Sequence, residues 1–191
     1  MQPRIVIFAR WPQAGRAKTR LIPRFGAQGA AQIYRKLLAR TISAARDSGL
    51  PFALRVTGGE GAHFRETYGA DLALEEQGEG DLGARLARVE GPALVIGSDC
   101  PALDGAMLVR AAAALEQAEA VIGPASDGGY YLIGFRDTPR YLFSDMEWST
   151  PEVFAETIAR LEARGIAPAL LPELSDVDEP DDLVGWPELL P

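Results

Sequence analysis

The sequence predicts an α/β fold with a mostly parallel central sheet flanked by helices. Short, continuously apolar runs, typical of buried parallel strands, alternate along the chain with longer segments that keep helical spacing. The 191 residues, 47% of them hydrophobic, can bury a sizeable core and match the usual size of one domain. We therefore expect a single domain over residues 1–191, with ligands bound outside the carboxyl ends of the strands.

The first half of the chain is expected to begin with a buried strand at residues 5–8, which is short, β-rich and apolar throughout. A loop punctuated by proline and glycine follows through Phe25. From residue 27 to 47 apolar positions recur at helical spacing until Gly49 ends the pattern, which predicts an amphipathic helix. The next predicted elements are a strand at 52–57, a weak helix at 61–68 and a short strand at 72–74.

The second half continues the alternation with a helix at 81–89 and a buried strand at 93–96 that ends at Gly97-Ser98-Asp99. Asp104 can cap a helix running to about residue 117, because its carboxylate can accept the free amide protons of the first turn. The remaining predicted elements are strands at 120–123 and 130–135 and a helix that starts at Thr150-Pro151-Glu152 and ends near residue 164.

Charge is strongly segregated along the chain. The first 46 residues contain ten Lys or Arg and no Asp or Glu, although the formal net charge of the whole chain is −8. The other 145 residues therefore carry nine basic and 27 acidic side chains, a balance of −18. This separation favours a site that joins anion to metal, such as a phosphate-bearing substrate with a divalent cation.

The loop after the first strand holds the densest run of positive charge. Arginine can grip phosphate oxygens through two parallel hydrogen bonds, and lysine offers a compact, mobile charge suited to a leaving phosphate. The loop is therefore predicted to wrap a di- or triphosphate, with a merely solvated basic loop as the alternative. It lacks the GxxxxGK[ST] spacing of the Walker loop, which argues against an ordinary kinase or ATPase. The residues concerned are Arg10, Arg16, Lys18, Arg20 and Arg24, interleaved with Pro12, Gly15 and Pro23.

Acidic side chains supply the candidate metal site. Asp99 lies where a buried strand meets solvent, and a hard cation there would be held by carboxylate and phosphate oxygens together. Asp176 and Asp178 add two carboxylates that face the same way if the backbone between them is extended. The alternative is that Asp178 or Asp182 caps a helix and the other acids are surface charge.

Two glycine-containing loops supply further candidates. Residues 77–85 could bring backbone amides against a nucleotide base or ribose, with Gln77 or Arg85 adding contacts. Asp127, followed by two glycines and two tyrosines, could bind a sugar hydroxyl or take the proton of an acceptor. The alternative for the Asp127 segment is a tight turn before a strand.

Composition excludes several other classes of protein. The pI near 4.8 argues against general nucleic-acid binding, which needs a broad basic surface. No apolar run approaches the roughly 18–20 residues needed to cross a bilayer. One cysteine rules out an internal disulfide, and no secretory leader is recognisable, so we expect a cytoplasmic protein.

Four segments, at residues 8–21, 97–101, 127–134 and 176–183, resemble a small bacterial family of nucleotide-diphospho-sugar-transferase-like proteins. This family comprises glycosyltransferases associated with radical-SAM gene clusters, including those of arsenosugar synthesis, and the resemblance spans nearly the whole chain. The wider superfamily includes phospholactate guanylyltransferase, of deazaflavin-cofactor synthesis, and the molybdopterin nucleotidyltransferases. The resemblance implies a Rossmann-like glycosyltransferase-A sandwich that binds a nucleotide with Mg²⁺ or Mn²⁺.

The resemblance also implies roles for particular residues. The loop carrying Arg10, Gly15, Lys18 and Arg20 would hold phosphates, Asp99 would ligate the metal, and Asp178 matches the position of a second metal ligand in related nucleotidyltransferases. Cys100 follows Asp99, so the central motif is not an Asp-x-Asp. The first loop also lacks the LAGGxSxRMG form of sugar-nucleotide pyrophosphorylases.

The leading hypothesis is metal-dependent transfer of a glycosyl group from a nucleoside-diphospho sugar to a small-molecule acceptor. The metal and the basic loop, with Lys18, would neutralise the leaving diphosphate, and Asp127 would position or deprotonate the acceptor. The first alternative is nucleotidyl transfer, in which a phosphorylated small molecule attacks a nucleoside triphosphate and pyrophosphate leaves. A third possibility is a non-catalytic nucleotide-binding protein on the same fold.

Overall fold

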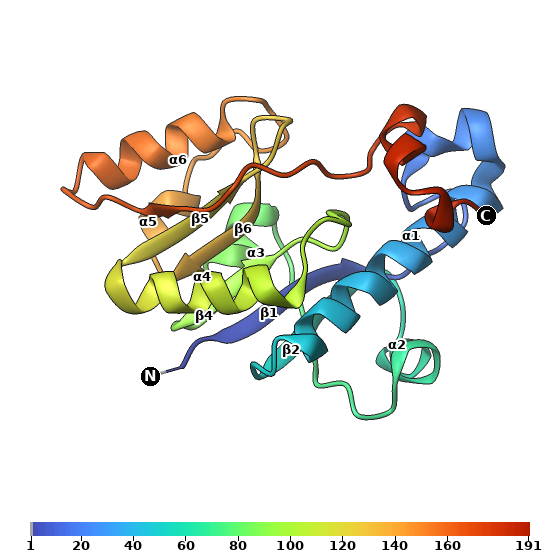
Figure 1. Ribbon diagram of the computed structural model, residues 1–191, viewed down its shortest axis with the longest axis horizontal. Helices are drawn as coiled ribbons and strands as arrows, with labels where there is room; N and C mark the ends of the chain where they lie inside the picture. Colours follow the sequence, from blue (N-terminus) through green and yellow to red (C-terminus); the bar gives the residue numbers. More distant parts are fainter. Residues whose placement is uncertain (1) are drawn as a thin grey trace.

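The computed structural model describes residues 2–191, which form one seven-stranded sheet with the strand order β3-β2-β1-β4-β6-β5-β7 (Figure 1). The strands are β1 (Arg4–Arg10), β2 (Phe52–Thr57), β3 (Leu74–Glu76), β4 (Ala93–Ile96), β5 (Ala120–Pro124), β6 (Tyr130–Phe135) and β7 (Ala169–Leu170). The α-helices are α1 (Ile22–Asp47), α2 (Gly61–Tyr68), α3 (Leu82–Leu86), α4 (Gly105–Gln117), α5 (Arg140–Phe143) and α6 (Val153–Glu162). Three short 3-10 helices, η1 (Thr19–Leu21), η2 (Pro180–Gly185) and η3 (Pro187–Leu189), complete the fold.

The sheet is mostly parallel, as the sequence predicts. Strand β1 pairs in parallel with both β2 and β4, and β2–β3 and β5–β7 are also parallel pairs. Only β6 runs antiparallel to both of its neighbours among the described strands. A short turn joins β5 to β6, and so short a connection can only reverse the chain, whereas the parallel neighbours are joined through helices. The turn between β5 and β6 therefore lies at the same edge of the sheet as the carboxyl ends of β1 and β4.

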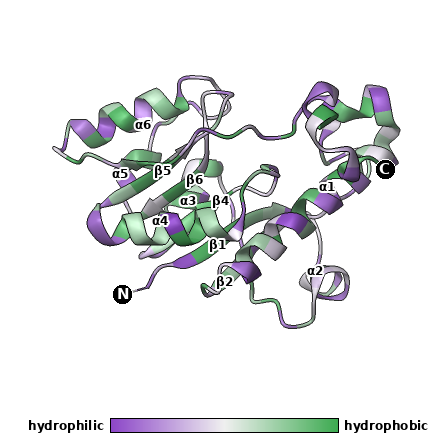
Figure 2. Ribbon diagram, in the orientation of Figure 1, coloured by the Kyte–Doolittle hydropathy of each residue, from purple (hydrophilic) through white to green (hydrophobic). Residues whose placement is uncertain are grey.

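Helices cover both faces of the sheet. Alternate residues of β1 point to opposite faces, so Ile5 and Ile7 pack with α1, α2 and α4, while Val6 packs on the side of α3, α5 and α6. Figure 2 shows apolar residues concentrated on the central strands and on the helix surfaces turned toward them. Burial of these two faces gives the three-layer α/β/α sandwich that the sequence predicts.

The last part of the chain returns to the start of the first helix. After β7 the chain crosses the carboxyl edge of the sheet and ends beside the beginning of α1, as Figure 1 shows in red and blue. Val177, Leu183 and Leu189 are buried there in one cluster with Leu21 of η1 and Ile33 of α1. This packing fixes the C-terminal segment, residues 171–189, above the ends of the strands.

Most predicted elements are present, with shifted ends. The first long helix starts at Ile22, but Gly26 breaks it with a φ of 70°, so the regular part begins near the predicted residue 27. The third strand is wrong by two residues, because Leu72 packs in the core while pairing with β2 begins only at Leu74. The last long helix starts later than predicted, at Val153. None of the helices within residues 2–191 has both the length and the apolar character to span a membrane.

Candidate functional site

Three segments meet at the carboxyl edge of the sheet. Asp99 follows β4 by two intervening residues, and Gly97 leaves room for it, because a Cβ at that position would lie 2.9 Å from Asp99 Oδ1. The C-terminal segment passes directly above, where the Val177 amide donates a hydrogen bond to the Asp99 carbonyl (2.9 Å). The third segment is the basic loop after β1. The backbone thus brings the two acidic stretches and the basic loop together.

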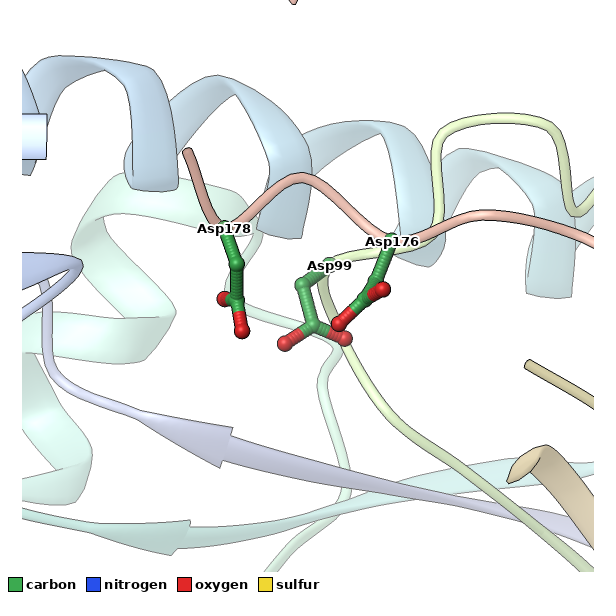
Figure 3. A group of neighbouring side chains, drawn as sticks. All are labelled: Asp99, Asp176 and Asp178. Carbon is green, nitrogen blue, oxygen red and sulfur yellow. The ribbon is translucent and has the colours of Figure 1, made fainter. Parts of the chain in front are cut away.

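Three carboxylates form the centre of this site. Asp99, Asp176 and Asp178 each offer an oxygen that lies within 4.8 Å of the others (Figure 3). Figure 3 also shows all three side chains pointing into the same space, with Asp99 between the other two. Asp176 and Asp178 point to the same side, whereas Val177 between them is buried in the core. We call Asp99, Asp176 and Asp178 the aspartate cluster.

The basic loop enters this cluster through Lys18. Its Nζ lies 3.0 Å from Asp99 Oδ2 and 2.5 Å from Asp178 Oδ1, and only 8% of the side chain is exposed. Burial by itself lowers the pKa of Lys18, but attraction to Asp99 and Asp178 outweighs it and holds the pKa above its usual range. Lys18 is also one of the few residues other than glycine with a positive φ, 46°. The loop backbone is thus held in an uncommon conformation where its lysine reaches the carboxylates.

One ammonium group leaves the cluster with excess negative charge. Arg20 lies 3.5 Å from Asp178 Oδ2, but its side chain is 69% exposed, so solvent screens this pair. Burial, followed by repulsion from Asp99, Asp178 and Asp127, raises the pKa of Asp176 to about 6. Three converging carboxylates with no nitrogen or sulfur donor among them are the chemistry that Mg²⁺ and Mn²⁺ prefer. The residues present therefore fit a divalent cation.

Of the two helix caps that the sequence suggests, Asp178 and Asp182, the structure has the one at Asp182. Asp182 Oδ2 accepts hydrogen bonds from the amides of Asp178 and Glu179 at the start of η2. The Asp178 carboxylate is thereby left to face Lys18. Capping and clustering are divided between two neighbouring acids, so both alternatives for this stretch have a counterpart in the structure.

The rest of the basic loop lies at the rim of the site. Arg10, Gly15 and Arg16 are all exposed. Gly15 has a φ of 79° with open space where a Cβ would point, so the turn requires glycine for its backbone conformation and not for close contact within the protein. These residues remain predicted phosphate ligands, and they lie on the same loop as the buried ammonium of Lys18.

Gln77 and Arg85 have other partners in the structure. The Gln77 side chain is buried, and its amide nitrogen donates to the carbonyls of Ala9 and Arg55, each at 3.0 Å. Its Oε1 accepts a hydrogen bond from Arg85. This network joins the ends of β1 and β2 to α3, so Gln77 supports the start of the basic loop from beneath. Direct nucleotide contact by these two residues remains a sequence-based prediction.

Asp127 lies on the turn between β5 and β6, next to the aspartate cluster. Its Oδ1 accepts a hydrogen bond from the Gly129 amide (2.8 Å), which is the tight-turn arrangement that the sequence allows. It is exposed, and its charge contributes to the raised pKa of Asp176. The turn geometry leaves the carboxylate at the edge of the site, where the predicted acceptor role would place it.

One feature predicted in part from the sequence is Asp176, whose spacing from Asp178 predicts two carboxylates on one side of the chain, although only Asp99 and Asp178 are predicted as metal ligands. A feature that the sequence does not predict is Tyr34, whose hydroxyl lies 2.8 Å from Ser98 Oγ and accepts a hydrogen bond from the Arg10 backbone amide (3.0 Å). Tyr34 sits on the apolar face of a helix, so its sequence context is that of an ordinary core residue.

Comparison with known families matches residues 41–150 to the family described as "Uncharacterized protein conserved in bacteria (DUF2064)". The chain belongs to this family. The matched region covers more than half of the sequence and includes Asp99 and Asp127, whereas Lys18, Asp176 and Asp178 lie outside it. No curated protein matches this member of the DUF2064 family.

Solved structures share the fold of this DUF2064 protein. A candidate nucleotide-diphospho-sugar transferase from Desulfovibrio desulfuricans G20 superposes with a TM-score of 0.87 at 27% identity, covering 94% of this chain and 84% of the other. Rv0371c from Mycobacterium tuberculosis H37Rv, in complex with manganese, has a TM-score of 0.58 at 21% identity, covering 100% and 98%. The 2-C-methyl-D-erythritol 4-phosphate cytidylyltransferase from Thermus thermophilus has a TM-score of 0.56 at 21% identity, covering 99% and 98%.

Proposed function

We propose that this DUF2064 protein transfers a glycosyl group from a nucleoside-diphospho sugar to a small-molecule acceptor with the help of Mg²⁺ or Mn²⁺. The observation that carries the proposal is the contact of Lys18 with Asp99 and Asp178. A lysine of the basic loop is buried against carboxylates that fit a divalent cation. A diphosphate bound there would meet cationic side chains on one side and a metal ion on the other. The likeness to a candidate nucleotide-diphospho-sugar transferase supports the same class of substrate.

The residues of the site suit the bond changes of glycosyl transfer. An acceptor oxygen forms a bond to the anomeric carbon, the bond from that carbon to the diphosphate breaks, and the electron pair goes to the departing phosphate oxygen. When bound, the metal ion would stabilise charge on that oxygen. Arg10, Arg16 and Arg20 would hold the other phosphate oxygens, and Lys18 would add a compact charge within the site.

Asp127 would act on the acceptor. Its carboxylate lies on an ordered turn beside the aspartate cluster, with one oxygen fixed by the Gly129 amide. It would accept a hydrogen bond from the acceptor hydroxyl and then its proton as the new bond forms. The proposal thus separates the roles: the aspartate cluster and the basic loop serve the donor, and Asp127 serves the acceptor.

Nucleotidyl transfer is the second candidate function. It is favoured by the positions of the two predicted metal ligands in the chain. Asp99 comes from the loop after β4 and is not part of an Asp-x-Asp motif, and Asp178 comes from the C-terminal segment, where related nucleotidyltransferases have their second metal ligand. In this reaction an acceptor phosphate oxygen would attack the α-phosphorus of a nucleoside triphosphate, and the bond to pyrophosphate would break. The same basic loop would then hold the leaving pyrophosphate.

The first experiment is a thermal-shift panel of nucleoside triphosphates, nucleoside diphosphates and nucleotide sugars, each with Mn²⁺, with Mg²⁺ or with a chelator. Mn²⁺ is a natural probe because a protein of the same fold has been crystallised with it. We expect metal-dependent stabilisation by one nucleotide sugar, and its loss in Asp99→Asn and Lys18→Met. Asp137→Asn is the matched control, an exposed carboxylate beyond the end of β6, at the opposite edge of the sheet.

The product identifies the reaction. Release of a nucleoside diphosphate from the stabilising nucleotide sugar, in the presence of an acceptor, supports glycosyl transfer. Stabilisation by a triphosphate with release of pyrophosphate supports nucleotidyl transfer. Binding without turnover over a broad acceptor panel supports a nucleotide-binding protein, and no response to any nucleotide contradicts the proposed site.

A further inference from the structure

A tyrosine inside the core joins the two loops of the proposed site. Tyr34 lies on α1 with only 7% of its surface exposed. Its hydroxyl oxygen accepts a hydrogen bond from the Arg10 amide (3.0 Å) and lies 2.8 Å from Ser98 Oγ, where either hydroxyl can donate. Arg10 begins the basic loop, and Ser98 directly precedes Asp99. One hydroxyl group therefore contacts the start of both segments.

This contact lies where the sheet no longer connects the two strands. Pairing between β1 and β4 ends at Ile7 and Ile96, whereas β1 continues to Arg10 paired with β2 alone. Beyond this point Ser98 and Asp99 have left the ladder. The Tyr34 hydroxyl provides a hydrogen-bonded link between the end of β1 and the Asp99 turn at just this level of the sheet.

Both side chains of the Tyr34–Ser98 hydrogen bond are buried. Ser98 is 5% exposed, so a Ser98 hydroxyl without Tyr34 would lose a partner that solvent cannot easily replace. The Tyr34 hydroxyl is protonated and able to donate at neutral pH, because the ordinary pKa of tyrosine is near 10 and burial raises the pKa of Tyr34 further. A bond between two buried side chains restricts the rotamers of both, and it thereby restricts the backbone that carries Asp99.

We infer that Tyr34 is a positioning residue that, through Ser98, holds the Asp99 carboxylate in register with the basic loop for binding of a divalent cation. The inference rests on the proposed function, since it assigns Tyr34 to the metal site of that function. The hydrogen bonds of the Tyr34 hydroxyl go to the Arg10 amide and to Ser98, so Tyr34 would act on the metal site only through these neighbours. Replacing Tyr34 should therefore change the affinity for the cation even when no nucleotide is present.

The test measures Mn²⁺ binding by calorimetry to the full-length wild type, Tyr34→Phe, Ser98→Ala and the double variant. Tyr34→Phe should weaken Mn²⁺ binding about 2- to 13-fold, the factor that corresponds to loss of the hydrogen bond with Ser98 at about 0.5–1.5 kcal/mol. Ser98→Ala should do the same, and the double variant should be no weaker than the weaker single variant. Tyr68→Phe is the matched control, because the Tyr68 hydroxyl is buried and has no hydrogen-bond partner within residues 2–191.

The outcomes separate this inference from the function on which it rests. If the wild type binds Mn²⁺ and Tyr34→Phe binds it equally well while losing thermal stability, Tyr34 is only a core residue and the inference is overturned. If the wild type binds no Mn²⁺, the proposed metal site fails first. If Tyr34→Phe does not fold, Ser98→Ala tests the same bond from its other end, and unchanged Mn²⁺ affinity in that variant contradicts the inference.

Discussion

At the scale of single residues, Lys18 is the most informative side chain of the site. Its ammonium group pairs with Asp99 and with Asp178, which come from different parts of the chain. Without it, the two carboxylates would face each other with no cation between them. Both carboxylates are more than one third exposed, so solvent relieves part of the repulsion and limits the cost. In chelator, Lys18→Met should therefore lower the free energy of unfolding by about 1–3 kcal/mol, the scale of a hydrogen bond to a charged group.

Urea unfolding with and without Mn²⁺ checks this prediction. Mn²⁺ should recover part of the lost stability, because the divalent cation replaces the missing charge. Arg16→Met is the matched control, since Arg16 lies on the same loop, is exposed and makes no ion pair within residues 2–191. Equal unfolding free energies of Lys18→Met and Arg16→Met in chelator would contradict the role given to Lys18.

Replacing Asp176 should raise the free energy of unfolding, whereas replacing Lys18 should lower it. Its pKa is about 6 in the folded protein and near 3.8 in the unfolded chain, so ionisation favours unfolding. The destabilisation is absent below the unfolded pKa, grows as pH rises, and is complete above about pH 6. Asp176→Asn removes it. Without metal this variant should be more stable than the wild type at about pH 7.5 and indistinguishable from it at low pH.

Thermal unfolding in chelator over about pH 4–8 measures this difference. The same substitution should weaken stabilisation by Mn²⁺, because it removes one carboxylate ligand. Asp137→Asn, an exposed carboxylate outside the aspartate cluster, should show neither effect. A wild type that stays as stable as Asp176→Asn on the alkaline side of this range would contradict the raised pKa of Asp176.

At the scale of elements, the strands that the sequence predicts correctly are those whose own residues form an apolar run. The strands β1, β2, β4, β5 and β6 lie where apolar runs predict them, because burial of an apolar run depends on the residues of that run. The two-residue β7 and the single-turn α5 carry no such signal and were not predicted. The reversed direction of β6 follows from a short turn, and the lengths of the connections decide it more than the strand residues do.

The helix cap at Asp104 is predicted correctly from the sequence, whereas the cap predicted at Thr150 is wrong, because Thr150 Oγ1 donates a hydrogen bond to the Glu147 carbonyl and α6 begins at Val153 without a side-chain cap. Asp104 Oδ1 accepts a hydrogen bond from the Met107 amide (2.8 Å) at the start of α4, as the sequence predicts. The Asp104→Ala variant should lose about 1 kcal/mol of unfolding free energy. Its Mn²⁺ affinity should equal that of the wild type, because the cap lies in α4 and not in the aspartate cluster.

Chemical denaturation and Mn²⁺ titration of Asp104→Ala test these two statements together. The matched control is Glu116→Ala, an exposed acid in the last turn of α4, which should change stability by less than about 0.5 kcal/mol. A large loss of Mn²⁺ affinity in Asp104→Ala would mean that α4 helps to position Asp99, and the separation of cap and site would then be wrong.

At the scale of the whole molecule, the segregated charges of the sequence meet in space. Lys18 and Asp178 are 160 positions apart, yet they form the shortest contact of the site. Sequence reasoning could place Asp99 at a strand end and Lys18 in a neighbouring loop, because both follow predicted strands. It could not place Tyr34, whose partners at Arg10 and Ser98 are brought together only by packing of α1 on the sheet.

This arrangement predicts that a divalent cation tightens the molecule locally. The C-terminal segment is held over the site by the packing of Val177, by its amide bond to Asp99 and by the contact of Asp178 with Lys18, and a cation on the aspartate cluster would add a fourth connection. At Mn²⁺ concentrations about 100-fold above the dissociation constant, openings that break the site become about 2.7 kcal/mol costlier. Amides of residues 176–179 that exchange through such openings should then exchange about 100-fold more slowly.

Hydrogen exchange followed by mass spectrometry measures this effect peptide by peptide. Peptides from α6, on the opposite face of the sheet, serve as the internal reference and should show much less protection. Asp99→Asn should abolish the protection of 176–179, since it removes the ligand that connects β4 to the C-terminal segment. Protection spread evenly over the protein would show that Mn²⁺ binds elsewhere or acts only on global unfolding, whereas protection confined to the two loops and the C-terminal segment places the cation where their charges converge.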